Sequence, residues 1–268
     1  MPILKSGQFD IDYLDVGSGP AVILIHSAAS NNRQWRALIE DHKHQYRFIA
    51  PNLFGYGYTS AWPAAKKQSI DDHVSLIEAL STLVDDGFSI VGHSLGGTIA
   101  AFAASKLGTR VRSLILLEAN PFPLLNREGR KESFAEVLSL RDFIVEQGEK
   151  GEWQTVGERF VDYWLGPDSW QRLSPERQQT FIEALPNNVY EWDAVMDIDS
   201  SAGLWQSISA RTLLFCASET KLPIAEIYAI LRQDCPHWDY QEITEGGHMA
   251  PITRPDLVNP TIIEHIEK

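Results

Sequence analysis

The chain has 268 residues, 44% of them hydrophobic, which is enough for one α/β domain with an insertion. Its 36 acidic and 23 basic residues give a net charge of −13 at pH 7. This charge repels phosphate backbones and anionic lipid surfaces, so we expect no nucleic-acid and no membrane partner. Two cysteines are too few for a disulfide framework or a cysteine metal cluster. Without a signal-peptide pattern or a run of roughly 18 apolar residues, the sequence predicts a cytoplasmic protein.

Strand and helix patterns alternate along the first part of the chain. Residues 9–16 alternate in polarity like a half-exposed strand. Residues 21–25 form a continuous apolar run, which is typical of a central parallel strand covered on both faces. Residues 46–51 predict another strand. Behind the N-cap candidate Ser69, apolar residues at helical spacing predict a helix over residues 70–83.

The next strand pattern, residues 88–91, leads into the G-x-S-x-G sequence of residues 92–96. This motif holds a serine on a sharp strand-to-helix turn, where glycines avoid a clash with the neighbouring backbone. An ordinary glycine turn is the alternative, but the small-residue helix pattern that follows favours a nucleophile. We therefore predict Ser94 as the nucleophile. The N–H of Leu95, at the positive end of that helix, is the predicted oxyanion donor.

The alternation stops after the strand predicted for residues 111–117. Residues 121–205 contain no strand-like run and instead show amphipathic helix patterns rich in Trp and Tyr. We expect this segment to form a helical cap over the sheet; ordinary peripheral helices are the alternative. Strand patterns resume at residues 212–217 and 238–243, with a helix between them and another near the end of the chain.

These patterns predict an α/β fold: a mostly parallel central sheet with helices on both faces, plus the cap. Residues 1–120 and 206–268 would form the core domain, and residues 121–205 the cap. The carboxyl ends of parallel strands meet at one edge of such a sheet. Side chains that follow those strands are therefore expected at one site.

A serine hydroxyl needs a base to take its proton, and the base works best when an acid fixes its tautomer. Of the eight histidines, His248 lies on a glycine-hinged loop just beyond the last predicted strand, at the edge that carries Ser94. The acid is expected between serine and histidine in chain order. Glu219, which follows one strand and precedes the strand leading to His248, is the preferred candidate. Glu118, at the end of the strand after the nucleophile helix, is the alternative.

A second oxyanion donor is expected in the loop after residues 21–25, where small side chains let the backbone approach a substrate. The N–H of Ala28 is the preferred donor and that of Ser27 the alternative. Motif histidines and aromatic side chains are expected to line a pocket nearby, although aromatic residues are more often core than pocket. The pocket candidates are His26, His93, Phe54, Trp164 and Trp192.

Together these residues resemble the α/β-hydrolase superfamily over nearly the whole chain. The likeness rests on the elbow of residues 92–97, the Leu24-Ile25-His26 lead into the oxyanion loop, and Gly247-His248-Met249 before Pro251. The resemblance implies the α/β-hydrolase fold with a helical cap. It also implies an acid in the slot of Glu219, although some dehalogenase-like members place a glutamate at the slot of Glu118.

The expected function is a serine hydrolase that cleaves a small carboxylic ester, thioester or lactone through an acyl-enzyme, with a small molecule as substrate and no metal or cofactor. Serine at position 94 argues against the superfamily's epoxide hydrolases and haloalkane dehalogenases, because a resemblance to those enzymes would require an aspartate nucleophile. Two alternatives stay open: hydrolysis of a carbon–carbon bond in a diketone-like acid, and a hydrolase-fold receptor for a small molecule. The sequence leaves the substrate and the oligomeric state open.

Overall fold

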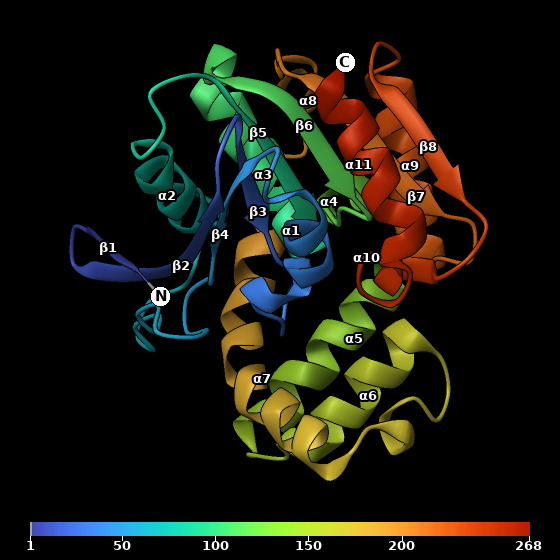
Figure 1. Ribbon diagram of the computed structural model, residues 1–268. Coiled ribbons are helices and arrows are strands. Elements are labelled where there is room, and N and C mark those ends of the chain that lie inside the picture. The colour runs from blue at the N-terminus through green and yellow to red at the C-terminus, as the bar shows by residue number, and fades with distance from the viewer. Residues whose placement is uncertain (1) are drawn as a thin grey trace.

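The computed structural model describes residues 2–268 and contains one sheet of eight strands (Figure 1). In spatial order the strands are β1-β2-β4-β3-β5-β6-β7-β8. Strand β2 pairs antiparallel with β1 and β4, whereas the six strands from β4 to β8 in that order are parallel. Their bounds are β1 Ile3–Ser6, β2 Phe9–Gly17, β3 Ala21–Ile25, β4 Arg47–Pro51, β5 Phe88–His93, β6 Val111–Leu117, β7 Arg211–Ala217 and β8 Asp239–Ile243.

Helices cover both faces of the sheet. Helices α1 and α11 pack on one face, and α2, α3 and α9 pack on the other. No helix within residues 2–268 is both long enough and apolar enough to span a membrane. The bounds of the helices that flank the sheet are α1 Arg36–His42, α2 Ile70–Ser81, α3 Leu95–Leu107, α9 Leu222–Asp234, α10 Ala250–Thr253 and α11 Pro255–Glu267.

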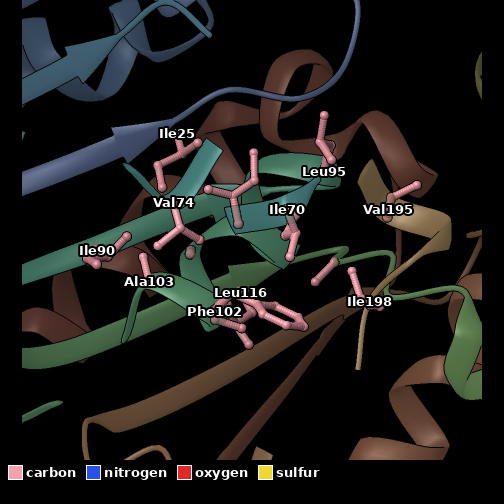
Figure 2. Close-up of a cluster of buried hydrophobic side chains, with 14 of the residues drawn as sticks. Ile25, Ile70, Val74, Ile90, Leu95, Phe102, Ala103, Leu116, Val195 and Ile198 are labelled. Carbon is pink, nitrogen blue, oxygen red and sulfur yellow. The ribbon is translucent and has the colours of Figure 1, made fainter. Parts of the chain in front are cut away.

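The apolar run of β3 serves both faces because successive side chains of a strand point in opposite directions. Ile23 and Ile25 join the core beneath α2 and α3 (Figure 2), whereas Val22 and Leu24 join the core beneath α1 and α11. All four side chains are fully buried. Such two-sided burial fixes the register of the central strands, and therefore the position at which each strand ends.

Between β6 and β7 the chain forms only helices. Figure 1 shows α5, α6 and α7 as a layer beyond the carboxyl ends of the parallel strands. Helix α6 packs on the 3₁₀ turn η4 (Gly247–Met249), and α7 packs on α3. The inserted elements are α4 Pro123–Arg127, α5 Lys131–Glu149, α6 Trp153–Leu165, η3 Trp170–Arg172, α7 Pro175–Met196 and α8 Ala202–Gln206.

The predicted fold class is confirmed, a mostly parallel sheet with helices on both faces and a helical insertion. Predicted bounds of the main strands agree with the structure to within a residue, except that β5 continues two residues beyond its predicted end. Strand β1 and helix α1 have no counterpart in the prediction. Strand β1 has only four residues and alternates between half-buried and exposed positions. Helix α1 has seven residues and no side-chain cap, so neither element has the periodicity that identifies longer ones.

We expect Ser69→Ala to lower the free energy of unfolding by about 1 kcal/mol, because Ser69 caps helix α2. Its Oγ accepts from the N–H of Asp72, and Asp72 Oδ2 accepts from the N–H of Ser69 at 2.8 Å. Ser75→Ala is the control, since Ser75 lies inside the same helix and caps nothing. Urea unfolding that gives equal losses for the two variants would contradict the capping role.

Candidate active site

Ser94 lies on the turn between β5 and α3, with φ 55° and ψ −120°. A non-glycine residue with positive φ is strained, and such strain often marks a functional site. Gly92 and Gly96 allow this turn. A Cβ on Gly92 would lie under 3.0 Å from the backbone of Gly96, and a Cβ on Gly96 would lie under 3.0 Å from the carbonyl of Ile25. The turn therefore requires glycine on both sides of the serine.

His248, in the turn η4, connects this serine to a carboxylate. Its Nε2 lies 3.0 Å from Ser94 Oγ, and its Nδ1 lies 3.2 Å from Glu118 Oε2. A carboxylate only accepts hydrogen bonds, so Nδ1–H donates to Glu118. This leaves Nε2 free to accept from the hydroxyl of Ser94. His248 and Glu118 are 3% and 1% exposed, so the chain of hydrogen bonds is screened from water.

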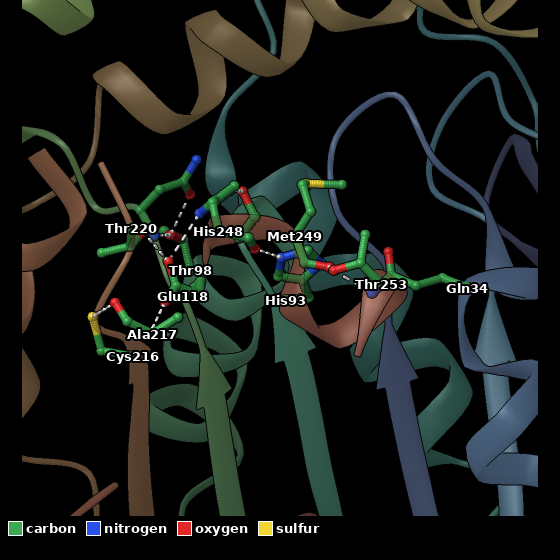
Figure 3. Close-up of polar contacts among 12 residues, drawn as sticks. Gln34, His93, Thr98, Glu118, Cys216, Ala217, Thr220, His248, Met249 and Thr253 are labelled. Carbon is green, nitrogen blue, oxygen red and sulfur yellow. Dashed lines mark hydrogen bonds and ion pairs between the residues drawn. The ribbon is translucent and has the colours of Figure 1, made fainter. Parts of the chain in front are cut away.

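Glu118 follows β6 and is held in place by the end of the neighbouring strand β7 and the loop after it (Figure 3). The N–H of Ala217 donates to Oε1 at 2.5 Å, and the hydroxyl of Thr220 donates to Oε2. With His248, three groups therefore donate to this buried carboxylate. Such donors fix the orientation of the carboxylate beside the imidazole.

The preference for Glu219 as the partner of His248 does not agree with this geometry. The side chain of Glu219 is exposed, and Glu118 occupies the position beside the imidazole. The physical reason is the end of β7: the N–H of Ser218 bonds the carbonyl of Ile243 at 2.8 Å, and the chain then turns. This turn directs the backbone N–H of Ala217 and the hydroxyl of Thr220 toward Glu118 and leaves the Glu219 side chain in solvent.

His93 links the three loops of the site. Its Nε2–H donates to the carbonyl of His248 at 2.8 Å, and its Nδ1 accepts from Gln34 Nε2 at 3.1 Å. The other end of that amide, Gln34 Oε1, accepts from both the N–H and the hydroxyl of Ser27. Burial lowers the pKa of His93 to about 3, so the ring stays neutral and keeps these roles.

A cavity of about 240 Å³ opens beside Ser94 and His248. Trp164 of α6 and Trp192 of α7 both contribute to its lining, and the Trp164 ring stacks on His248 with centroids 3.9 Å apart. Other lining side chains were not among the sequence candidates. These are Ala29, Ser30, Asn120, Phe122, Phe160, Phe181, Asn188, Glu191, Val195, Met249 and Ile252.

Three candidates for the pocket lie outside its lining, which corrects the expectation for them. His26 is fully buried, with its Nδ1–H donating to the carbonyl of Ser27 and its Nε2 accepting from the N–H of Leu53. His93 is fully buried in the link described above. Phe54 packs against Phe9 in the core. His26 directly follows β3 and His93 is the last residue of β5, and their nitrogens bond backbone groups of the adjoining loops and the Gln34 side chain.

Two backbone amides at the cavity have the position expected of oxyanion donors. Ala28 and Leu95 both line the cavity, and no hydrogen bond within residues 2–268 uses the N–H of either one. The N–H of Ser27, the alternative donor, is bonded to Gln34 Oε1 at 3.1 Å. The N–H of Ala29 is bonded to Tyr56 Oη at 3.0 Å. The geometry therefore favours Ala28 over Ser27.

The polar residues of helix α7 were missed, although the sequence contains a signal for them. Leu185, Asn188, Trp192 and Val195 recur at helical spacing, and Glu191 lies next to them on the buried side. Polar residues at positions that the apolar periodicity assigns to the buried face of a helix are rarely without a role. Within the described part of the chain, no three His, Cys, Asp or Glu side chains gather as metal ligands.

Comparison with known proteins agrees with this architecture. The sequence profile of the alpha/beta hydrolase fold family matches residues 20–255. The chain is 31% identical to lipase LipV of Mycobacterium tuberculosis over 177 residues, a match that spans 65% of this chain and only 62% of the lipase. It is 23% identical to (E)-2-((N-methylformamido)methylene)succinate hydrolase of Acinetobacter baylyi over 95% of this chain and 93% of that one.

Among solved structures, the enol-lactonase of Burkholderia xenovorans aligns over 100% of both chains with a TM-score of 0.82 and 16% identity. That likeness concerns the fold. The fold, the elbow and the profile match together define the class: the chain belongs to the alpha/beta hydrolase fold family. Members with these names are hydrolases that act on different substrates, so the family alone leaves the substrate open.

We expect Gly96→Val to abolish accumulation of soluble protein, because the new side chain would overlap the carbonyls of Ile25 and His26. Gly203→Ala is the matched control, since a Cβ at that position has no neighbour within 4 Å. Soluble yield and thermal unfolding of the two variants check the expectation. A Gly96→Val protein that melts like the wild type would show that the turn tolerates a side chain.

Stability should fall as the pH drops below about 6.5, because burial lowers the pKa of His26 to about 4 and of His73 and His93 to about 3. These rings stay neutral in the folded protein, whereas the unfolded chain binds protons at them. Protonation of each of these three histidines in the unfolded chain should lower the free energy of unfolding by about 2 kcal/mol between pH 7 and pH 5. The raised pKa of Glu191 acts in the opposite direction.

His73, which lies outside the site, isolates this effect. Urea unfolding of His73→Gln at pH 7 and pH 5 should show a fall that is about 2 kcal/mol smaller than that of the wild type. The same fall in both proteins would mean that His73 is not neutral in the folded state.

Proposed function

We propose that the protein is a serine hydrolase that cleaves a small carboxylic ester, thioester or lactone through an acyl-enzyme on Ser94. The observation that carries this proposal is the continuous chain from Ser94 Oγ through His248 to Glu118, at the wall of an apolar cavity. This arrangement supplies a nucleophile, a base and a group that orients the base. The names of the relatives, a lipase among them, are consistent with this reaction class.

In the first half of the reaction, Ser94 Oγ attacks the substrate carbonyl carbon while its proton passes to His248 Nε2. The carbonyl oxygen becomes an oxyanion, to which the N–H groups of Leu95 and Ala28 donate. Glu118 stabilises the imidazolium through its hydrogen bond to Nδ1. The tetrahedral intermediate then collapses: the bond to the leaving group breaks, and His248 Nε2–H gives its proton to that group.

In the second half, His248 takes a proton from a water molecule that attacks the acyl carbon, and the same two amides hold the second oxyanion. Collapse of this intermediate breaks the bond to Ser94 Oγ, which regains its proton from His248. The carboxylic acid then leaves the cavity. The proton that leaves with the first product is replaced by one from the water molecule, so Ser94 and His248 end in their starting protonation states and the cycle needs no metal or cofactor as a reactant.

Residues 121–205 would act as a cap in this scheme, with residues 1–120 and 206–268 as the catalytic core. Helices α6 and α7 contribute Trp164 and Trp192 to the cavity, which supports a role for this segment in selecting the substrate. Trp164 also covers one face of His248. An aromatic face beside the imidazolium favours its positive charge.

Exchange of the acid tests this proposal. With p-nitrophenyl butyrate as substrate, Glu118→Gln should lower kcat by up to about 10⁴-fold, because it removes the charge that stabilises the imidazolium and permits the wrong tautomer. Glu219→Gln is the matched control and should keep kcat within about 2-fold of the wild type, because the exposed side chain of Glu219 makes no hydrogen bond to His248, Ser94 or Glu118. Thermal unfolding confirms that both variants are folded.

The reverse pattern, with Glu219→Gln nearly inactive, would transfer the role to Glu219 and contradict the geometry. The kinetics also distinguish the receptor alternative. Steady release of p-nitrophenol over many turnovers supports an enzyme, whereas a single stoichiometric release would support a receptor that is acylated once.

A further inference from the structure

Glu191 is an ionisable residue of the cavity that the proposed reaction does not use. It is 2% exposed and lies on helix α7 among apolar lining residues. One carboxyl oxygen, Oε2, accepts from Asn188 Nδ2 at 2.9 Å. The other, Oε1, has no hydrogen-bond partner within residues 2–268. A buried carboxyl oxygen without a partner is costly, so its presence in a substrate cavity calls for a reason.

Neighbouring groups hold this carboxyl in a fixed position. Trp192 Nε1 donates to Asn188 Oδ1 at 3.0 Å, which turns the amide of Asn188 so that its NH₂ donates to Glu191. The Tyr56 hydroxyl, which accepts from the N–H of Ala29, lies near Glu191 as well. Helix α7 and the loop of Ala29 therefore both contribute polar groups near the Glu191 carboxyl.

No positive charge balances Glu191 inside the cavity. The described lining contains no Lys or Arg, and His248 is its only other titratable side chain. Burial raises the pKa of Glu191 to about 7, while the nearby Asn188 amide, Tyr56 hydroxyl and Ala29 N–H act in the opposite direction. A cation brought by a ligand would supply the positive charge that the lining lacks, and an uncharged donor would pair with Oε1.

We propose that Glu191 is the anchor of a substrate subsite that accepts a hydrogen bond from an ammonium or hydroxyl group of the ester. This inference rests on the proposed function, because it names the class of ester that the Ser94 site hydrolyses. The apolar side chains hold the carbon chain, and the carboxyl of Glu191 pairs with the donor. An ammonium group is favoured over a hydroxyl, because it also neutralises a carboxylate in a site of low dielectric constant.

A purely structural role makes a different prediction. If Glu191 only held Asn188 in place, a glutamine could do the same through its side-chain oxygen. Any change in kcat/KM in Glu191→Gln would then be the same for all esters. If Glu191 binds the substrate, loss of its charge should lower kcat/KM for esters that carry a donor group. The relative kcat/KM values of esters without a donor group should not change. The ratio of kcat/KM between matched esters separates the two roles.

The test measures hydrolysis of methyl esters at pH 7.5, and titration with base records the acid that is released. Methyl butyrate is compared with methyl 3-aminobutyrate and methyl 3-hydroxybutyrate, and methyl hexanoate with methyl 6-aminohexanoate and methyl 6-hydroxyhexanoate. The short and long series cover two distances between the ester and the donor. The proteins are the wild type, Glu191→Gln, Glu191→Met as a second variant should glutamine impair folding, and Glu183→Gln as a control at an exposed position of the same helix.

For at least one of the two chain lengths, the kcat/KM of the wild type should be about 10-fold higher for a donor-bearing ester than for the plain ester. A charged hydrogen bond in a buried site allows a difference of this size. Glu191→Gln or Glu191→Met should lose this preference, and Glu183→Gln should keep it. Whether the amine or the hydroxyl series shows the effect identifies the donor. The proposal is wrong if the wild type shows no preference, or if the preference survives in both Glu191 variants.

A binding measurement keeps the subsite and the reaction apart. Calorimetric titration of Ser94→Ala with the same esters should show that the donor-bearing ester binds more tightly than the plain ester. In Ser94→Ala/Glu191→Gln the two esters should bind equally. If the wild type hydrolyses no ester but this difference in binding remains, the proposed function fails and the subsite stands. Equal binding of both members by Ser94→Ala would overturn the subsite.

Discussion

The buried hydrogen bond between His248 and Glu118 is the interaction on which the arrangement of the site depends. It fixes the proton on Nδ1, so that Nε2 faces Ser94 as an acceptor. Glu118 can play this part because the N–H of Ala217 and the hydroxyl of Thr220 also donate to it. These donors hold the buried carboxylate in a fixed orientation beside the imidazole. The register of β6 against β7 thus determines which acid meets the histidine.

A second network holds the surrounding loops in place. His93, the last residue of β5, donates to the backbone carbonyl of His248, and Gln34 joins His93 to Ser27 of the oxyanion loop. Because the bond from His93 is to a backbone carbonyl, it positions the loop of His248 without competing for the ring. The nucleophile turn, the histidine loop and the oxyanion loop therefore form one hydrogen-bonded unit at the carboxyl edge of the sheet. Rigid placement of this kind is what transition-state stabilisation by fixed donors requires.

Some of this arrangement could be predicted from the sequence, for physical reasons that differ from residue to residue. The turn at Ser94 is a local structure whose glycines are dictated by backbone clashes, so the five-residue motif and the helix pattern after it predict the turn together. His248 follows from the rule that the carboxyl ends of parallel strands meet at one edge. The acid did not follow, because chain order permits both Glu219 and Glu118, and the decision depends on a turn after β7 that no local pattern specifies.

The pocket was the least predictable part, because it forms between helices of the insertion and loops of the sheet that are far apart in sequence. Trp164 and Trp192 line it, yet nothing in their local sequence distinguishes them from core aromatics such as Phe54. His26 and His93 look functional because they lie in recognisable motifs, but their nitrogens are used by loop backbone and by Gln34. Glu191 is the opposite case: it lies in no recognisable motif, yet it lines the cavity from the buried face of a helix.

The most direct test of the account is the site at which a serine-reactive fluorophosphonate attaches. The account predicts one adduct per chain, on the peptide that contains Ser94, by mass spectrometry after proteolysis. It also predicts that labelling requires His248 as the base and is lost in Ser94→Ala. Attachment at any other residue, or labelling that persists in Ser94→Ala, would contradict the assignment of Ser94 as the nucleophile.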